Sequence, residues 1–393
     1  MAAIRAAERG HRVVLLERTR DGGRKILISG GGRCNVLPSQ LHPSRYFTAS
    51  SPNTLKKMLL SWPLSEQRRF FEHDLRIPLQ LEAASGKLFP ASNRARDVRD
   101  ALIDRARYSG VEIRFEVIVR DISPDGDRWR VQLDDGTSIE AAAVIVATGG
   151  LSVPATGSDG TGLRILRRLG HTIHDTYPAL TPLTAEPPVH AALAGISLDV
   201  TLEAPMARKR FTTRGGFLFT HRGYSGPAVL NISHFAVQSR MRGEHQPILV
   251  QWTGLDVGAW DELMRAGGSA SVGSIVRRHL PARLGDWLID HAGVDEGRTL
   301  ATLRRDQRAR VVAALARYEL PWTGDEGYKK AEVTGGGVAL GEVNPATMES
   351  RLHPGLFLCG EVLDAFGPIG GYNFAWAWAT GRLAGNGPAS PAD

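Results

Sequence analysis

The sequence predicts an α/β protein whose parallel sheet is interrupted by a second unit, rich in β-strands and helices. Residues 1–189 alternate helical segments with apolar, β-branched ones, as parallel sheets require. Residues 190–330 change to short strands followed by Arg-rich helices. Residues 331–386 return to apolar strands and a Gly-rich turn, which would complete the first sheet, and residues 387–393 are expected to be a loose tail.

The composition is that of an ordinary globular protein. Of 393 residues, 42% are hydrophobic and 23% are charged, which excludes the disordered and fibrous classes. Two cysteines, Cys34 and Cys359, are too few for a disulfide framework, and no Cys or His spacing indicates a metal site. No apolar run is long enough to cross a membrane and no secretory pattern opens the chain, so we expect a cytoplasmic protein.

Basic side chains exceed acidic ones, and the formal net charge is +7. The excess is concentrated in residues 1–120 and 190–330. It fits a phosphate-rich partner, and it equally fits a solvated surface. The basic clusters are Arg208, Lys209, Arg210, Arg214 and Arg222 in one stretch, and Arg304, Arg305, Arg308 and Arg310 in another.

The first 17 residues have the pattern of half a dinucleotide-binding unit. Helix-forming residues 2–9 end at Gly10, and an apolar strand then ends at Glu17. In a complete βαβ unit a strand and a Gly-rich turn precede this helix, and the acid accepts hydrogen bonds from ribose hydroxyls. We therefore predict a Rossmann-like fold in which Glu17 binds a ribose.

That first strand and its turn do not precede the helix in the sequence as numbered. Either translation begins upstream of Met1, or the chain has lost its phosphate loop. We expect the first, because loss of a central strand would expose unpaired backbone groups. Upstream in-frame codons for a strand and a glycine turn would decide between the two.

Three consecutive glycines occur within the segment 29–35, which reads Ser-Gly-Gly-Gly-Arg-Cys-Asn. Such a run is costly to order unless the backbone must approach a partner closely. It is either a mobile linker or a ligand-contacting loop with N–H groups suited to phosphate. The basic and amide side chains that flank the glycines favour the ligand loop.

Several other elements follow from periodicity and turn signals. We expect amphipathic helices over residues 53–75 and 94–109, and a strand over 111–119. A buried strand over 141–147 ends on small residues, where open α/β sheets bind ligands. The glycines near 370 either open a helix toward a ligand or form a packing turn, and the tryptophans of that helix are expected in the core.

Together these motifs resemble the BaiN/RdsA-type flavoproteins, also described as YhiN-like or aminoacetone-oxidase-like FAD-binding proteins. The resemblance covers essentially the whole chain, although similar proteins have a GxGPAGL-type turn directly before the segment that matches Met1. The chain as numbered is therefore expected to hold FAD weakly. The matching segments are 25–35, 86–92, 147–157, 218–227, 335–338, 347–350 and 360–373.

The resemblance implies a glutathione-reductase-like FAD-binding domain and a set of residues along the cofactor. Glu361 would lie near the ribityl chain, and the turn before residue 374 would direct helix N–H groups at the flavin. The implied cofactor residues are Glu17, Lys25, Ser29, Gly30, Gly31, Gly32, Arg33, Asn35, Val119, Thr148, Gly149, Gly150, Gly360, Glu361, Gly370, Gly371, Tyr372 and Asn373.

The resemblance also implies an FAD-dependent oxidoreductase, with NADH or NADPH as a transient reductant. The activity it suggests is reduction of uridine to dihydrouridine in large-subunit ribosomal RNA. The alternatives are a small-molecule flavin reductase or oxidase and a nonenzymatic RNA-associated flavoprotein. Cys34 and His221 are the candidate proton donors, each with a plain structural alternative as a buried thiol or a turn residue.

Overall fold

The computed structural model describes residues 1–206 and 210–389 and divides into two compact units. Unit 1 contains Met1–Pro178 and the chain from Glu332 onward, and unit 2 is Ala179–Ala331. Unit 2 begins before residue 190 because strand β11 (Leu183–Thr184) pairs with other strands of that unit. Arg208, Lys209 and the tail residues 390–393 lie outside the described residues.

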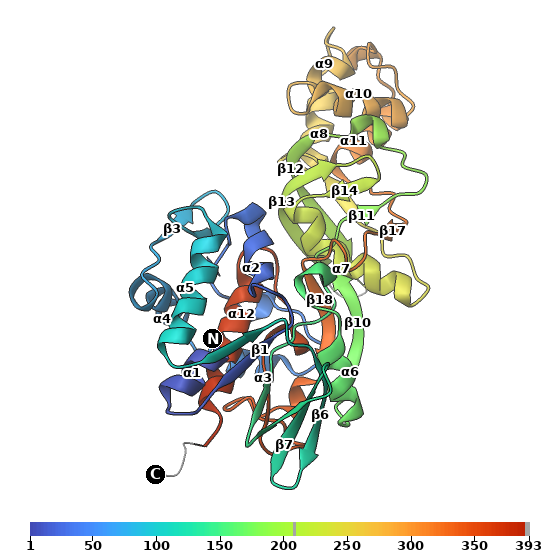
Figure 1. Ribbon diagram of the computed structural model, residues 1–393. Coiled ribbons are helices and arrows are strands. Elements are labelled where there is room, and N and C mark those ends of the chain that lie inside the picture. Colours follow the sequence, from blue (N-terminus) through green and yellow to red (C-terminus); the bar gives the residue numbers. More distant parts are fainter. Residues whose placement is uncertain (207–209, 390–393) are drawn as a thin grey trace. The chain divides into compact units, whose positions relative to one another are not determined.

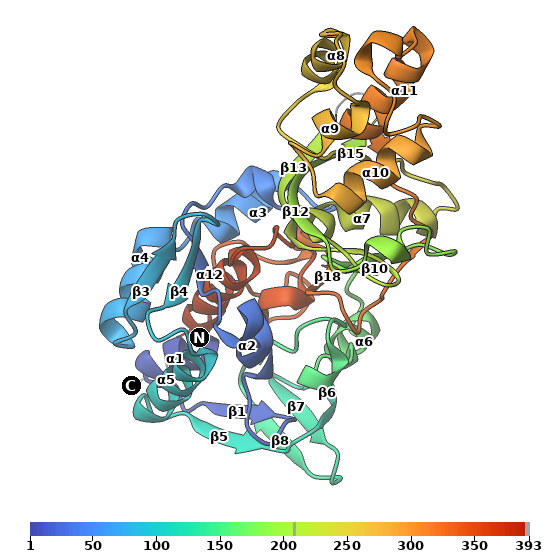
Figure 2. The ribbon, with the colours of Figure 1, turned by 90° about the horizontal axis from the view of Figure 1, so that it is seen from above.

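Unit 1 contains two pairs of parallel strands. Strand β1 (Val14–Glu17) pairs with β5 (Glu112–Phe115), and Figure 2 shows these two strands near each other. Strand β9 (Val144–Val146) pairs with β19 (Leu356–Leu358). Their carboxyl ends lead directly into the Glu17, Thr148 and Gly360 segments. The parallel strands therefore deliver predicted site residues at their carboxyl ends, as α/β sheets do.

Helix α12 (Tyr372–Asn386) passes through the middle of unit 1 (Figure 1). Helix α1 (Ala2–Glu8) approaches it at two glycines four residues apart. A Cβ on Gly385 would lie 2.3 Å from the Ala2 carbonyl oxygen, and one on Gly381 would meet the Met1 side chain at 3.3 Å. Close contact of the two helices thus depends on residues without side chains.

The chain leaves unit 1 and returns to it through two paired strands, β10 (Ile173–Ala179) and β18 (Val333–Val338). All six residues of β18 are buried. A Cβ on Gly335 would lie 2.3 Å from the Tyr177 ring, and one on Gly336 would lie 2.2 Å from the Asp175 carbonyl oxygen. The glycine run therefore allows β18 to pack tightly against β10.

Unit 2 is built on a seven-stranded antiparallel sheet with the order β16-β15-β12-β13-β14-β11-β17. Its longest ladder joins β12 (Ser197–Pro205) to β13 (Arg210–Phe219). Helix α7 (Pro227–Met241) and four shorter helices bury a core of aliphatic and aromatic side chains against it. The predicted strands and Arg-rich helices of this region are present.

Two predicted elements differ from the structure. The helix expected over 53–75 is broken, because Pro63 separates α3 (Pro52–Leu59) from α4 (Leu64–Arg69). The strand expected over 111–119 is two strands, because Glu116 adopts a left-handed conformation (φ 60°) that ends β5.

Two properties of the described residues concern membranes and metal ions. Within 1–206 and 210–389, every helix is too short or too polar to cross a membrane. The same residues contain no group of three or more His, Cys, Asp or Glu side chains placed to hold a metal ion.

The remaining helices and strands complete the two units. In unit 1 they are α2 (Arg24–Ile28), β2 (Leu37–Pro38), β3 (Leu79–Glu82), β4 (Lys87–Pro90), α5 (Ala95–Tyr108), β6 (Val119–Asp125), β7 (Arg128–Leu133), β8 (Ser138–Ala141) and α6 (Thr161–Arg168). In unit 2 they are β14 (Gly223–Ser225), β15 (Leu249–Gln251), α8 (Val257–Arg265), α9 (Val272–Val276), α10 (Ala282–His291), α11 (Arg305–Ala316), β16 (Tyr318–Glu319) and β17 (Gly324–Asp325).

Candidate functional site

Lys25, Ser152 and Glu361 form a compact polar cluster in unit 1. The Lys25 Nζ donates to Glu361 Oε2 at 2.6 Å and also to the Ser152 Oγ. The Ser152 Oγ in turn donates to Glu361 Oε1 at 2.6 Å. Residues 336 positions apart in the chain are thereby joined by an ion pair.

Thr334 fixes the loop that carries Ser152. Its Oγ1 accepts hydrogen bonds from the backbone N of Leu151 (2.7 Å) and of Ser152 (3.1 Å), and its own backbone N donates to Glu361 Oε1 (3.0 Å). A Cβ on Gly150 would lie 2.4 Å from the Thr334 Oγ1 and 3.1 Å from Glu361 Oε1. Gly150 is therefore required for the cluster to close.

The charge of Glu361 is stabilised by its neighbours. Burial by itself would raise the pKa of this carboxyl, but the Lys25 ammonium and the hydrogen bonds from Ser152 and Thr334 lower it below its usual value. The Lys25 side chain is 29% exposed and that of Glu361 is 17% exposed. Both charged groups therefore remain reachable by a ligand.

The glycine loop and the start of α12 meet at Asn35. With its amide oriented so that Nδ2 donates to the Leu37 carbonyl (3.2 Å), the Asn35 Oδ1 accepts from the Gly371 backbone N (3.0 Å). Gly371 has φ 89°, and a Cβ there would lie 2.5 Å from the Leu37 carbonyl carbon. Two of the predicted cofactor segments are thus in direct contact.

The three consecutive glycines have different surroundings. A Cβ on Gly30 would be tightly placed against Phe89 (3.0 Å) and the Asn35 N (3.1 Å). A Cβ on Gly31 would meet nothing within 4 Å, and one on Gly32 only the Leu27 carbonyl oxygen at 3.9 Å. Both glycines have positive φ, 67° and 84°. Because almost nothing lies near them, the backbone of this part of the loop borders open space.

The flanks of the loop are anchored on the surface of unit 1. The Arg33 guanidinium lies over the Phe89 ring, 4.0 Å from its centroid, and pairs with Glu82 at 3.0 Å. The Ser29 Oγ donates to the Ile26 carbonyl at 2.8 Å. These contacts fix the loop at its two ends.

Glu17 and the start of β6 lie at the same end of β1. The Glu17 Oε1 accepts from the backbone N and the hydroxyl of Thr19, both at 2.7 Å. The Val117 N donates to the Glu17 carbonyl oxygen at 3.0 Å, two residues before Val119 opens β6. One carboxylate oxygen is thus engaged in the local turn, and the segments of Glu17 and Val119 are adjacent.

The turn before α12 is closed by its own side chains. The Asn373 amide makes two hydrogen bonds to Gly367, and the Tyr372 hydroxyl accepts from Arg45 at 2.6 Å. Gly370 lies near the aliphatic part of Lys87, which a Cβ would meet at 3.8 Å. The Gly360 N donates to the Thr380 hydroxyl at 3.0 Å, which ties the Glu361 turn to the same helix.

The two small residues before Gly150 pack against the segment around α6. A Cβ on Gly149 would lie 2.9 Å from the Ser158 Oγ, and Gly162 leaves room for the Thr148 side chain. This packing fixes the carboxyl end of β9.

The two predicted proton donors have different surroundings. Cys34 is completely buried, and burial raises the pKa of its thiol to about 12. His221 is exposed and belongs to unit 2, two residues after the end of β13. Within the described part of unit 1, no hydrogen bond or ion pair joins Cys34 to the Lys25–Ser152–Glu361 cluster.

Sequence reasoning missed Ser152 and Thr334. Each is a single hydroxyl residue beside a glycine motif, and a lone Ser or Thr in a loop has no spacing that marks it. Their signal is position alone: Ser152 follows the Gly149-Gly150 pair by two residues, and Thr334 precedes three glycines. The tryptophans behaved as expected, since Trp376 and Trp378 are both buried.

The family model described as the HI0933-like protein Rossmann domain matches residues 1–387. The chain belongs to the HI0933-like family. The family recognised from the sequence motifs and the predicted Rossmann-like α/β fold class are therefore confirmed.

Curated relatives of this HI0933-like protein match it over nearly its full length. A ribosomal RNA dihydrouridine synthase of Escherichia coli is 32% identical, and the match covers 95% of this chain and 91% of the relative. A 3-dehydro-bile acid delta(4,6)-reductase of Clostridium scindens is 30% identical over 98% of this chain and 95% of the relative. Among solved structures, a 3-ketosteroid-delta4-(5alpha)-dehydrogenase of Rhodococcus jostii aligns with a TM-score of 0.44 and 15% identity, covering 98% of this chain and 92% of that one.

Proposed function

We propose that this HI0933-like protein is an FAD-dependent oxidoreductase that holds its cofactor in unit 1. The observation that carries the proposal is the Lys25–Ser152–Glu361 cluster, which joins separated segments predicted to line one cofactor. One relative is named as a dihydrouridine synthase and the other as a bile acid reductase, and both names support an oxidoreductase.

The residues present fit FAD. Gly31 and Gly32 leave open space beside the backbone, where a phosphate group can approach closely. The partly exposed ammonium and carboxylate of Lys25 and Glu361 can donate to and accept from ribityl hydroxyls. The N-terminus of α12, opened by Gly371, suits a ring edge that carries negative charge. When bound, FAD supplies the hydride chemistry that amino-acid side chains lack.

The proposed roles follow the order of the segments. Glu17 accepts from the adenosine ribose, and the backbone at Val119 passes the adenine. The loop 29–35 lies along the phosphates with Lys25, and Thr148, Gly149 and Gly150 border the cofactor. Gly360 and Glu361 face the ribityl chain, and the turn Gly370-Gly371-Tyr372-Asn373 faces the flavin.

We propose uridine in large-subunit ribosomal RNA as the substrate. The reaction saturates one ring double bond, with NADH or NADPH giving the hydride and solvent giving the proton, so that dihydrouridine and the oxidised nucleotide result. The name of the Escherichia coli relative and the net charge of +7 support an RNA substrate, which would locate the protein in the cytoplasm.

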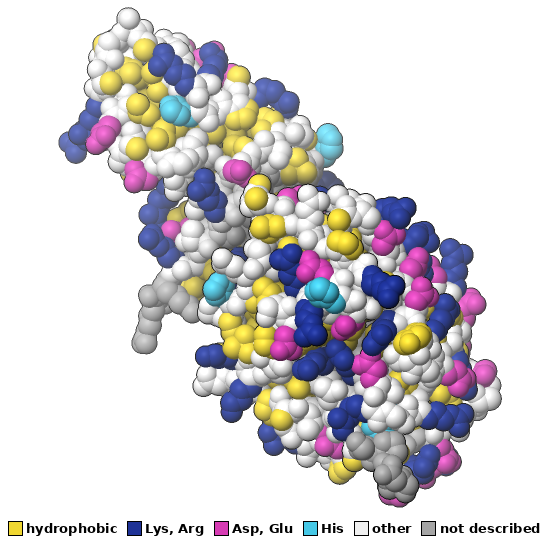
Figure 3. All heavy atoms as spheres, turned by 90° about the vertical axis from the view of Figure 1, so that its left-hand side faces the viewer, with side chains coloured by type: hydrophobic (Ala, Val, Ile, Leu, Met, Phe, Trp, Pro, Cys, Tyr) yellow, Lys and Arg dark blue, Asp and Glu magenta, His cyan; other side chains and the backbone are white. Residues whose placement is uncertain are grey.

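The basic clusters are unequal candidates for RNA contact. On α11 and just before it, Arg308 pairs with Asp261 (2.9 Å) and Arg310 with Asp306 (3.0 Å), which neutralises much of the positive charge there. Arg214 on β13 and Arg222 are exposed as well, and the described residues provide no ion pair to either of them. On the face in Figure 3, basic side chains are interspersed with acidic ones. We therefore favour Arg214 and Arg222 for phosphate contact.

Titration with FAD tests the cofactor assignment. Glu361→Gln removes the partner charge of Lys25, and charge-assisted bonds of about 1.5–3 kcal/mol predict at least a tenfold weaker FAD affinity. Flavin fluorescence measures the affinity, and Glu349→Gln serves as a control of the same chemistry outside the cluster. An FAD affinity equal to that of the unaltered protein would remove the Glu361 assignment.

Nucleoside mass spectrometry of ribosomal RNA tests the substrate. A strain that lacks the gene should lose dihydrouridine from large-subunit RNA, and the unaltered gene should restore it while the Glu361→Gln form restores less. Unchanged dihydrouridine in the deletion strain would contradict the RNA substrate while leaving the FAD titration intact.

A small-molecule reductase is the second candidate, favoured by the bile-acid reductase relative. Oxidation of NADH or NADPH stimulated by a steroid enone, and independent of RNA, would select it. If neither nucleotide reduces the bound flavin, the remaining interpretation is a nonenzymatic RNA-associated flavoprotein.

A further inference from the structure

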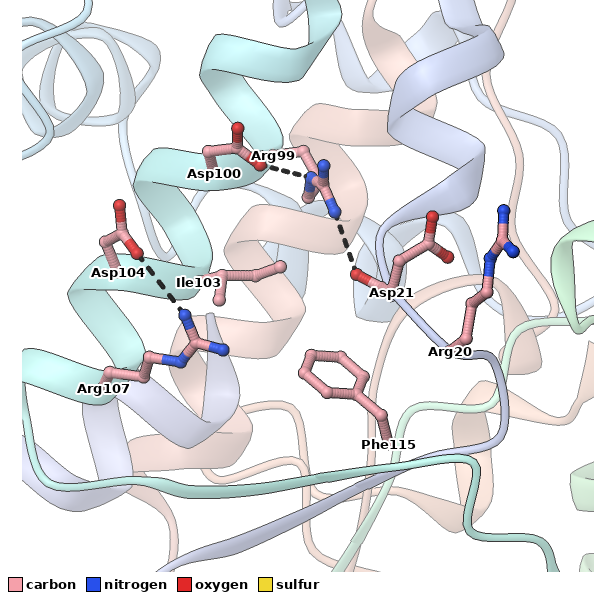
Figure 4. A pocket seen from close by; sticks show the side chains of 8 residues that line it. All are labelled: Arg20, Asp21, Arg99, Asp100, Ile103, Asp104, Arg107 and Phe115. Atoms are coloured by element: carbon pink, nitrogen blue, oxygen red, sulfur yellow. Dashed lines mark hydrogen bonds and ion pairs between the residues drawn. The ribbon is translucent and has the colours of Figure 1, made fainter.

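A cavity of about 400 Å³ lies in unit 1 beside helix α5 (Figure 4). It is bounded by this helix, by the loop that follows β1 and by Phe115, the last residue of β5. Ligands of open α/β sheets bind at the carboxyl ends of parallel strands, and this cavity lies at two such ends. Its volume is within the range of small-molecule sites.

Of the eight side chains that line the cavity, six are charged, three arginines and three aspartates, and two are apolar, Ile103 and Phe115. Figure 4 shows the side chains of Ile103 and Phe115 pointing toward its centre, one from α5 and one from the end of β5. A planar ring that stacks on Phe115 would gain both dispersion and burial of apolar surface.

One wall of the cavity is already neutralised. The Arg99 guanidinium pairs with Asp100 at 2.5 Å and donates to the Asp21 carbonyl oxygen at 3.1 Å. The Asp21 carboxylate pairs with Arg24 at 2.8 Å. The lining residues Arg99, Asp100 and Asp21 are therefore already engaged, with one another or with Arg24 behind the wall.

Two other guanidinium groups lie on opposite sides of the cavity and are weakly engaged. Arg107 makes only a long pair with Asp104 at 3.8 Å, and the two side chains are 59% and 73% exposed. For the Arg20 guanidinium, the described part of the chain provides neither a hydrogen bond nor an ion pair, and Figure 4 shows it across the cavity from Arg107. An aromatic floor between two available guanidinium groups suits a ligand with a flat base and an anionic group.

We propose that this cavity binds a nucleoside monophosphate unit, with the base on Phe115 and the phosphate held by Arg20 or Arg107. The unit could come from a free nucleotide, such as the adenosine half of a nicotinamide dinucleotide, or from one nucleotide of an RNA chain. None of the lining residues belongs to the Lys25–Ser152–Glu361 cluster. Because Glu17 lies three residues before Arg20, the experiment must separate this site from the adenosine end of FAD.

The test is titration of the protein after incubation with excess FAD. Adenosine monophosphate is followed by calorimetry, and a labelled single-stranded oligouridylate by fluorescence anisotropy. At least one should bind. Arg107→Gln or Arg20→Gln should weaken binding about tenfold, the size expected for a charge-assisted contact, and Phe115→Leu should weaken it similarly through lost stacking.

Arg114→Gln is the matched control, because Arg114 precedes Phe115, pairs with Glu112 at 2.7 Å and does not line the cavity. The affinity of the Arg114→Gln variant for either probe should equal that of the unaltered protein. Thermal unfolding checks that each variant is folded. Binding of the mononucleotide alone identifies a free nucleotide, and binding of the oligonucleotide alone identifies RNA.

Three results would overturn the proposal: no binding of either probe, binding unaffected by both arginine substitutions, or release of FAD by adenosine monophosphate. The last would make the cavity part of the flavin site. Because FAD affinity is measured separately on the same preparations, a failure of the flavin proposal remains distinguishable.

Discussion

Gly150 shows how a single missing side chain organises the candidate site. Its backbone passes so close to Thr334 that any Cβ would displace the hydroxyl that holds the Ser152 loop. The sequence indicated that Gly150 borders a ligand, but the immediate reason for glycine is a neighbouring protein group. Packing against Thr334 alone therefore requires glycine at this position.

Gly150→Ala should therefore lower the free energy of unfolding by about 1–3 kcal/mol, the usual cost of forcing extra volume into a packed site. Chemical denaturation measures it. Gly341→Ala is the control, because a Cβ there meets nothing within 4 Å, and it should change stability by less than about 0.5 kcal/mol. Equal effects of the two substitutions would disprove the packing argument.

The two thiols should be unreactive in the folded protein. Burial raises the pKa of Cys34 to about 12 and that of Cys359 to about 11, so both are protonated near neutral pH, whereas the thiolate is the reactive form. Iodoacetamide at about pH 8 should label neither cysteine until urea is added, as read by mass spectrometry. Rapid labelling of Cys34 in the native protein would show that it reaches solvent and would revive its role as a proton donor.

Among the elements, those with a clean apolar period were predicted well. The helix expected over 94–109 is α5, Ala95–Tyr108, because its periodicity is local and uninterrupted. The expected helix over 53–75 failed at Pro63, and the expected strand over 111–119 failed at Glu116. Glu116 has no local turn signal, so its left-handed conformation is imposed by tertiary contacts that one sequence does not reveal.

The N-terminus of α8 offers a test at the scale of one element. The Asp256 Oδ1 accepts from the Ala259 N at 2.8 Å and caps the helix. Asp256→Ala should cost about 1 kcal/mol of stability in unit 2, whereas Asp256→Asn, which keeps a capping oxygen, should cost little. Urea denaturation compares them, and an Asn variant as unstable as the Ala variant would exclude capping as the cause.

At the scale of the whole molecule, the change in composition near residue 190 indicated the second unit, but its boundary depended on β11, a two-residue strand too short to recognise. Lys25 and Glu361 were each predicted as cofactor residues, and that role stays a prediction. Their pairing was not predicted, because the choice of partner across 336 positions is made by the fold.

The two units should unfold as separate cooperative bodies, since each has its own core. Gly150→Ala should lower the stability of unit 1 alone, and Asp256→Ala that of unit 2 alone. Hydrogen exchange with mass spectrometry assigns each loss to its peptides. A uniform loss of protection over the whole chain in both variants would indicate one cooperative body.

The glycine run of β18 also limits how this protein can change over time. At Gly335, Gly336 and Gly337 a neighbouring ring or backbone atom occupies the volume that a methyl group would need. Surface positions can drift among many residues, but these three have no smaller or more permissive replacement. Strand β18, through which the chain returns to unit 1, should therefore tolerate almost no substitution at these positions.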